Sequence, residues 1–132
     1  MPIKVVNMYT RKDIQDNPSW LFVFGDNYKR QGTGGQAAEA RGEGNVAGIR
    51  TKKAPTYNAA DFMTDKEYYK NCKDILDDFK PVIQQLEVDG IVVWPFHGVG
   101  TGLAALPKNA PCTLQFINNM ITSLKSIYGV EI

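Results

Sequence analysis

The sequence has little charge imbalance, one histidine, two cysteines and no long apolar run. Fifteen basic residues oppose fourteen acidic ones, so the chain has no strong overall field that would attract nucleic acid or a membrane surface. No apolar stretch approaches the ~20 residues that span a bilayer, and residues 1–4 lack the basic and apolar regions of a signal peptide. We therefore expect a cytoplasmic protein with neither a membrane nor a nucleic-acid partner.

The chain also lacks the common signatures of metal, cofactor and nucleophile sites. Cys72 and Cys112 match no metal-ligand spacing, and they are either two neutral thiols or a disulfide. There is no paired-histidine motif, no lysine closing a Walker-type glycine loop and no Gly-x-Ser-x-Gly elbow. We expect no metal, no cofactor and no covalent nucleophile.

A hydrophobic content of 43% over 132 residues is enough for one core and too small for two ordinary domains, so we expect a single domain over residues 1–132. Residue patterns predict strands at residues 4–9, 21–24, 46–51, 90–95 and 128–132, and helices at 36–41, 64–86 and about 109–124. Thr10 with Asp13, and Thr64 with Glu67, have the spacing of helix caps, and Pro81 is expected to divide or kink the long helix. The alternation predicts an α/β fold whose mixed, mostly parallel sheet lies between helices.

Two glycine-rich segments each follow an apolar strand. Residues 32–35 come after the strand at 21–24, and residues 98–102 come after the strand at 90–95. Glycine lets a ligand approach the backbone, and unpaired N–H groups at such positions bind anions. Because ligands of open α/β sheets bind at strand ends, we expect one crevice for a small phosphate-bearing molecule. Alternatively, the glycines serve only a tight turn and a close contact between helix and sheet.

The order of these motifs carries a resemblance to a known family. A strand, an asparagine, a glycine cluster and an Ala-rich helix, followed later by a strand, a proline and the Gly-x-Gly-Thr-Gly loop at 98–102, resemble the macrodomain family of ADP-ribose-binding and ADP-ribose-hydrolysing proteins. The resemblance covers the skeleton of most of the chain and implies a three-layer fold. At residues 7–10, Asn-Met-Tyr-Thr stands where many macrodomains have an acidic residue that holds adenine.

A second resemblance is closer. The segments FGDN at 24–27, GTGGQA at 32–37 and GIRTK at 48–52 are similar to those of a small family of uncharacterised proteins found in T4-like phages and in bacteria. For a phage-encoded protein, this resemblance implies a location in the host cytoplasm.

The macrodomain resemblance implies roles for individual residues. Asn27 would contact a ribose, the glycines of the first loop would pass beside that ribose and the diphosphate, and the second loop would hold the phosphates. An amide such as that of Asn27 can both donate to and accept from sugar hydroxyls. The expected ligand-binding residues are Asn27, Gly32, Thr33, Gly34, Gly35, Gly98, Val99, Gly100, Thr101 and Gly102.

Several polar and aromatic residues have two interpretations. Asp26 is either a turn cap or a general base, and His97 is either a structural residue or a proton shuttle. Lys52 and Lys53 are either a solvated pair or a positive charge for a phosphate, and Arg41 and Arg50 have the same two interpretations. Tyr57 and Phe62 either stack on a base or plug the core.

The sequence thus predicts binding of ADP-ribose or a related phosphorylated nucleoside, with hydrolysis by Asp26 or His97 left open. The alternatives are a noncatalytic sensor or sponge for a nucleotide signal, or a protein-interaction module of phage origin that has lost its pocket.

Overall fold

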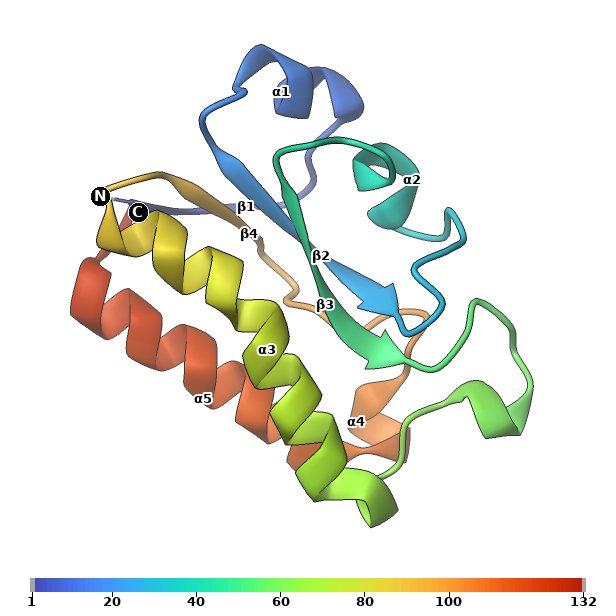
Figure 1. Cartoon of the computed structure of the whole chain (residues 1–132). Coiled ribbons are helices and arrows are strands. Elements are labelled where there is room, and N and C mark those ends of the chain that lie inside the picture. Colours follow the sequence, from blue (N-terminus) through green and yellow to red (C-terminus); the bar gives the residue numbers. More distant parts are fainter. Residues whose placement is uncertain (1, 132) are drawn as a thin grey trace.

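The computed structural model describes residues 2–131 as a five-stranded sheet with helices on both faces (Figure 1). The strands are β1 (Ile3–Val6), β2 (Leu21–Asn27), β3 (Val46–Lys52), β4 (Val92–Pro95) and β5 (Val130–Glu131). Their order across the sheet is β3-β2-β4-β1-β5, and every pair of neighbours is parallel. The predicted α/β class is confirmed. The sheet is parallel throughout these strands, rather than mixed, because each strand returns through a crossover connection. Residue 132 of the predicted last strand lies outside the described residues.

The helices form two outer layers. One face of the sheet carries α1 (Arg11–Asp16) and α2 (Ala37–Ala40), and the other carries α3 (Tyr68–Glu87) and α5 (Pro111–Tyr128). A short helix, α4 (Leu106–Asn109), connects β4 to α5, and two 3-10 turns (Ala59–Asp61 and Asp65–Glu67) precede α3. The three-layer arrangement is therefore present.

Two separate cores explain why the strands are apolar on both faces. Val23 of β2 belongs to the larger core under α3 and α5, whereas its neighbours Phe22 and Phe24 belong to the smaller core under α1 and α2. Successive side chains of a strand point to opposite faces. A continuous apolar run is thus what a strand covered on both sides requires.

The two predicted helix caps have different outcomes. Thr10 and Asp13 form a complete capping box, with Thr10 Oγ1 accepting from the Asp13 N–H at 3.1 Å and Asp13 Oδ2 accepting from the Thr10 N–H at 2.9 Å. The predicted box at Thr64 is wrong, because its side chain makes no cap hydrogen bond and α3 begins only at Tyr68. The residues between Thr64 and Tyr68 form a 3-10 turn. The Asp65 carboxylate of this turn accepts from the Cys112 and Thr113 N–H groups at the start of α5.

Two further expectations concern Pro81 and the cysteines. Pro81 lies inside α3 and does not divide it, because its ring is on the exposed side of the helix, where water can reach the carbonyl that loses its donor. Cys72 and Cys112 are free thiols, so they do not form a disulfide. None of the helices in the described part of the chain combines the length and apolarity needed to cross a membrane.

The capping box predicts a measurable asymmetry between two threonines. Thr10→Ala should lower the free energy of unfolding by about 1 kcal/mol, because it leaves a backbone N–H of the first turn without its acceptor. Thr64→Ala removes a side chain that caps nothing and should change stability much less. Urea denaturation of both variants measures the difference, and equal losses would contradict the assignment of the cap to Thr10.

Candidate functional site

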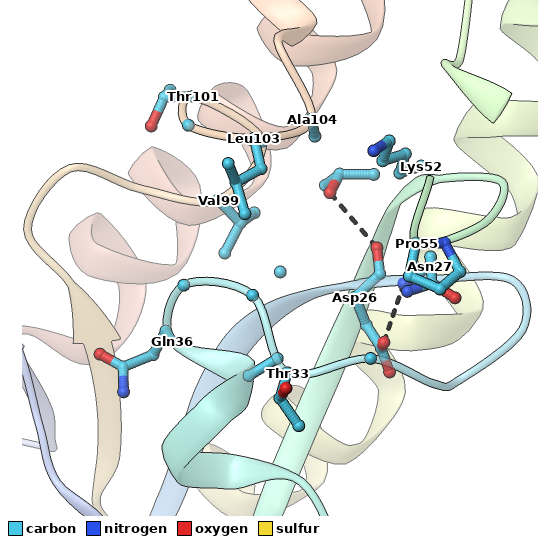
Figure 2. A pocket seen from close by; sticks show the side chains of 18 of the residues that line it. Asp26, Asn27, Thr33, Gln36, Lys52, Pro55, Val99, Thr101, Leu103 and Ala104 are labelled. Atoms are coloured by element: carbon cyan, nitrogen blue, oxygen red, sulfur yellow. Dashed lines mark hydrogen bonds between the residues drawn. The ribbon is translucent and has the colours of Figure 1, made fainter. Parts of the chain in front are cut away.

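A pocket of about 380 Å³ opens at the carboxyl ends of β2, β3 and β4 (Figure 2). Figure 2 shows Val99, Thr101 and Leu103 on one side and Asp26 and Lys52 on the other. The predicted crevice between the two glycine loops therefore exists. The expected ligand-binding residues and the two candidate bases all lie on its wall: Asp26, Asn27, Gly32, Thr33, Gly34, Gly35, His97, Gly98, Val99, Gly100, Thr101 and Gly102. Of the other candidates, Lys52 and Tyr57 line the pocket, whereas Lys53 and Phe62 do not.

The strand order brings the two loops into contact. A Cβ placed on Gly25 of β2 would lie 3.7 Å from the Gly100 backbone N, so the end of β2 runs directly beside the second loop. A Cβ placed on Gly34 would lie 2.7 Å from Leu103 Cδ1. The absence of a side chain at Gly34 therefore allows Leu103 to pack against the first loop across the pocket.

The second loop presents a run of free backbone donors. Within residues 2–131, none of the six N–H groups of residues 99–104 donates to a protein acceptor. Val99 is 3% exposed and Ala104 is 8% exposed, and buried N–H groups are nearly always paired. Gly98 and Gly100 have positive φ angles of 75° and 84°, the conformation that turns successive N–H groups toward one concave side. The loop therefore presents backbone donors that no protein acceptor in residues 2–131 engages, three of them on buried residues.

Asp26 is a buried carboxylate at the end of β2 that forms ion pairs with two arginines. Its side chain is only 3% exposed, and it accepts from Arg41 at 2.7 and 3.0 Å, from Arg30 at 3.1 Å and from the Asn27 N–H at 2.8 Å. Burial by itself would raise the pKa of the Asp26 carboxyl, but the hydrogen bonds from Arg41, the Asn27 N–H and Arg30 hold that pKa below its ordinary value. With both oxygens occupied, Asp26 is poorly suited to act as a general base.

Arg41 connects Asp26 to the first glycine loop through hydrogen bonds. Its guanidinium donates to the Gly32 carbonyl at 3.1 Å and to the Gln31 carbonyl at 3.0 Å while it holds Asp26. Gln36 fixes the other end of the loop, since its amide pairs with both the N–H and the carbonyl of Tyr9. The loop is therefore fastened at both ends, by Arg41 and by Gln36, and the sequence did not propose Gln36 for the site.

Asn27 has an unusual hydrogen-bond deficit. Its Nδ2 donates to the Gln31 carbonyl at 2.7 Å, which fixes the amide, but its buried Oδ1 has no partner among the described residues. The residue is 7% exposed and lies on the pocket wall. A buried acceptor without a donor costs free energy, so Asn27 Oδ1 is a polar atom that the described protein residues leave unsatisfied.

His97 lies at the exposed rim of the pocket. Its ring is edge-to-face with Phe96 at 5.2 Å between centroids, and its backbone carbonyl accepts from the Thr101 hydroxyl at 2.8 Å. The Thr101 hydroxyl is therefore engaged with the loop itself. No group of three or more His, Cys, Asp or Glu side chains that could hold a metal is found in residues 2–131.

Comparisons with known proteins identify the family but not its activity. Residues 4–120 match a family described as a family of unknown function (DUF7831). The chain belongs to this family. No curated protein and no solved structure matches the chain. Family membership therefore adds no ligand or reaction, and the resemblance to macrodomains and phage proteins stays a prediction.

The ion pairs of Asp26 make the free energy of unfolding depend on pH. Asp26→Asn should lower the free energy of unfolding at pH 7 by roughly 3 kcal/mol, because it removes the charge that compensates Arg41. A carboxyl whose pKa is lowered by folding contributes stability that is fully present above its unfolded pKa of about 3.9, and this stability is lost as the pH falls through the folded pKa. The difference between wild type and variant in urea denaturation should therefore shrink at acid pH. Asp77→Asn, which breaks an exposed pair with Lys80, is the control and should have little effect.

Proposed function

We propose that the pocket binds ADP-ribose or a related phosphorylated nucleoside, with phosphate oxygens against the N–H groups of residues 99–104. The run of free donors in a partly buried loop is the observation that carries this proposal. Phosphate oxygens are strong acceptors, and hydrogen bonds to charged groups are about twice as strong as neutral ones. The donors are fixed before binding, so little ordering is needed when the anion arrives.

Two groups beside the loop support a phosphorylated sugar. Asn27 and Lys52 both line the pocket; Asn27 Oδ1 has no donor among the described residues, and Lys52 brings a buried positive charge. The two residues are register partners on neighbouring strands. An acceptor beside a cation suits a ligand that carries hydroxyls close to a phosphate.

Recognition of a base must use the rim. The backbone of Tyr9 is occupied by Gln36, and its phenol donates to the Val23 carbonyl at 2.6 Å, so this part of the segment at 7–10 offers no free contact. Tyr57 and Leu103 line the pocket and are 75% and 50% exposed. These two side chains are available to pack on a flat ring at the mouth.

The binding proposal is tested by thermal shift with ADP-ribose, AMP, ADP, NAD, cyclic nucleotides and inorganic phosphate. A ligand at a hundred times its dissociation constant should add about 2.7 kcal/mol of apparent stability. Gly102→Glu should abolish the shift, because its carboxylate would repel the negatively charged phosphate. A Cβ at this position meets nothing within 4 Å, so the side chain fits without a clash. Gly100 is unsuitable, since a Cβ there would lie 2.3 Å from Leu106 Cδ1.

Gly44→Glu is the matched control. Gly44 is equally free of neighbours within 4 Å and lies outside the pocket, so the same charge there should leave the shift intact. Loss of the shift in both variants would indicate a general charge effect rather than a site. No shift with any compound in wild type would refute the nucleotide proposal and favour an interaction module, although the open pocket lends that alternative no support.

We further expect binding without turnover, because the Asp26 carboxylate is held by two arginines and His97 is the single remaining candidate for a base. Wild type should release no product from ADP-ribose or an ADP-ribosylated protein above the uncatalysed rate, and His97→Ala should bind like wild type. Chromatography of the reaction products provides the measurement. Turnover in wild type that disappears in His97→Ala, with the thermal shift retained, would instead establish a hydrolase.

A further inference from the structure

Lys52 is a buried cation with a fixed position on the pocket wall. It ends β3 and is 8% exposed, and its ammonium donates to the Thr56 carbonyl. The same nitrogen lies 4.8 Å from the ring centroid of Tyr57 and 4.5 Å from that of Phe62. An antiparallel bridge between Lys52 and Phe62 closes the loop that carries both rings. The aromatic faces and the carbonyl therefore hold the ammonium in place.

This charge has no carboxylate partner. Within residues 2–131, no Asp or Glu oxygen lies within 4.0 Å of the Lys52 ammonium. By contrast, Arg41 on the same wall is paired with Asp26, and the neighbouring Lys53 lies 2.6 Å from Glu67 outside the pocket. A buried ammonium is costly unless an anion compensates for the water that it has lost. The wall beside Lys52 is therefore a place for an anion supplied by the ligand.

We infer that Lys52 binds a terminal phosphate group, one bonded to the rest of the ligand through a single oxygen, and that the preferred ligands are nucleotides ending in such a phosphate, such as ADP. ADP-ribose is then the weaker ligand, because a ribose esterifies its second phosphate. This inference rests on the proposed function and narrows its ligand class.

The preference follows from charge. A terminal phosphate carries about −1.5 to −2 charges near pH 7, whereas an esterified one carries a single negative charge. Coulomb attraction to an ammonium grows in proportion to that charge. The attraction of the N–H dipoles of residues 99–104 to a phosphate also grows with its charge, so the contribution of Lys52 is the part of the preference that a substitution at Lys52 removes.

The test is a comparison of two ligands with two variants by titration calorimetry. Lys52→Met removes the ammonium and keeps an unbranched apolar side chain, one atom shorter, that packs favourably against aromatic rings. It should weaken ADP binding roughly tenfold or more and ADP-ribose binding only about threefold, because an esterified phosphate carries about half of the charge. Lys53→Met removes the neighbouring charge outside the pocket and should alter neither affinity.

The outcomes separate this inference from the proposed function. If Lys52→Met weakens both ligands equally or neither, or if wild type binds ADP-ribose but not ADP, the inference is overturned and the nucleotide-binding proposal stands. If wild type binds neither ligand, both are overturned.

A second measurement uses wild type alone and decides the matter if Lys52→Met does not fold. ADP is compared with its β-methyl ester, which has the same nucleotide but one charge fewer on the terminal phosphate. The ester should bind roughly fivefold more weakly. Equal affinities would overturn the inference.

Discussion

The carboxylate of Asp26 is a buried negative charge at the end of a strand, and three segments of the chain converge on it. Arg41 binds both of its oxygens and, with the same guanidinium, two carbonyls of the first glycine loop. Arg30 joins it to Asp78 of α3. Since a carboxylate removed from water must be compensated by such donors, one charge fixes the glycine loop, β2 and α3 relative to one another.

The same charge explains why a glycine stands within β3. A Cβ on Gly48 would lie 2.7 Å from Asp26 Oδ2 and 2.9 Å from Arg30 Nη1, and Arg30 also donates to the Gly48 carbonyl at 2.9 Å. The ion pair packs directly on the backbone of the neighbouring strand. The segments 24–27 and 48–52 are separate motifs in the sequence, and the structure packs Asp26 of the first against Gly48 of the second.

The sequence could predict the features that depend on residues close together in the chain, and it could not predict those that depend on tertiary contacts. The apolar runs predicted β2 and β4, and a parallel sheet then places the glycine loops at one edge. The length of β2 was not predictable, because the strand continues through Asp26 and Asn27 only when arginines 4 and 15 residues away neutralise the carboxylate. Thr10 and Thr64 have the same local pattern, and only the tertiary contact of Asp65 with α5 separates a real cap from a false one. Asp26 resembled a base in the sequence for the same reason, because Arg41, which binds both of its oxygens, lies 15 residues away along the chain.

The net charge that the pocket wall presents depends on which of its charged side chains are paired. A carboxylate standing alone on the wall would repel a phosphate, but Arg41 and Arg30 engage both oxygens of Asp26, so this wall presents no free negative charge. Among the charged side chains that line the pocket, Asp26 and Arg41 cancel, and Lys52 keeps its charge uncompensated. The proposed affinity for an anion therefore does not require a basic protein: in a chain with a formal charge of +1, the proposal rests on one buried cation and a row of free N–H groups that line the same cavity.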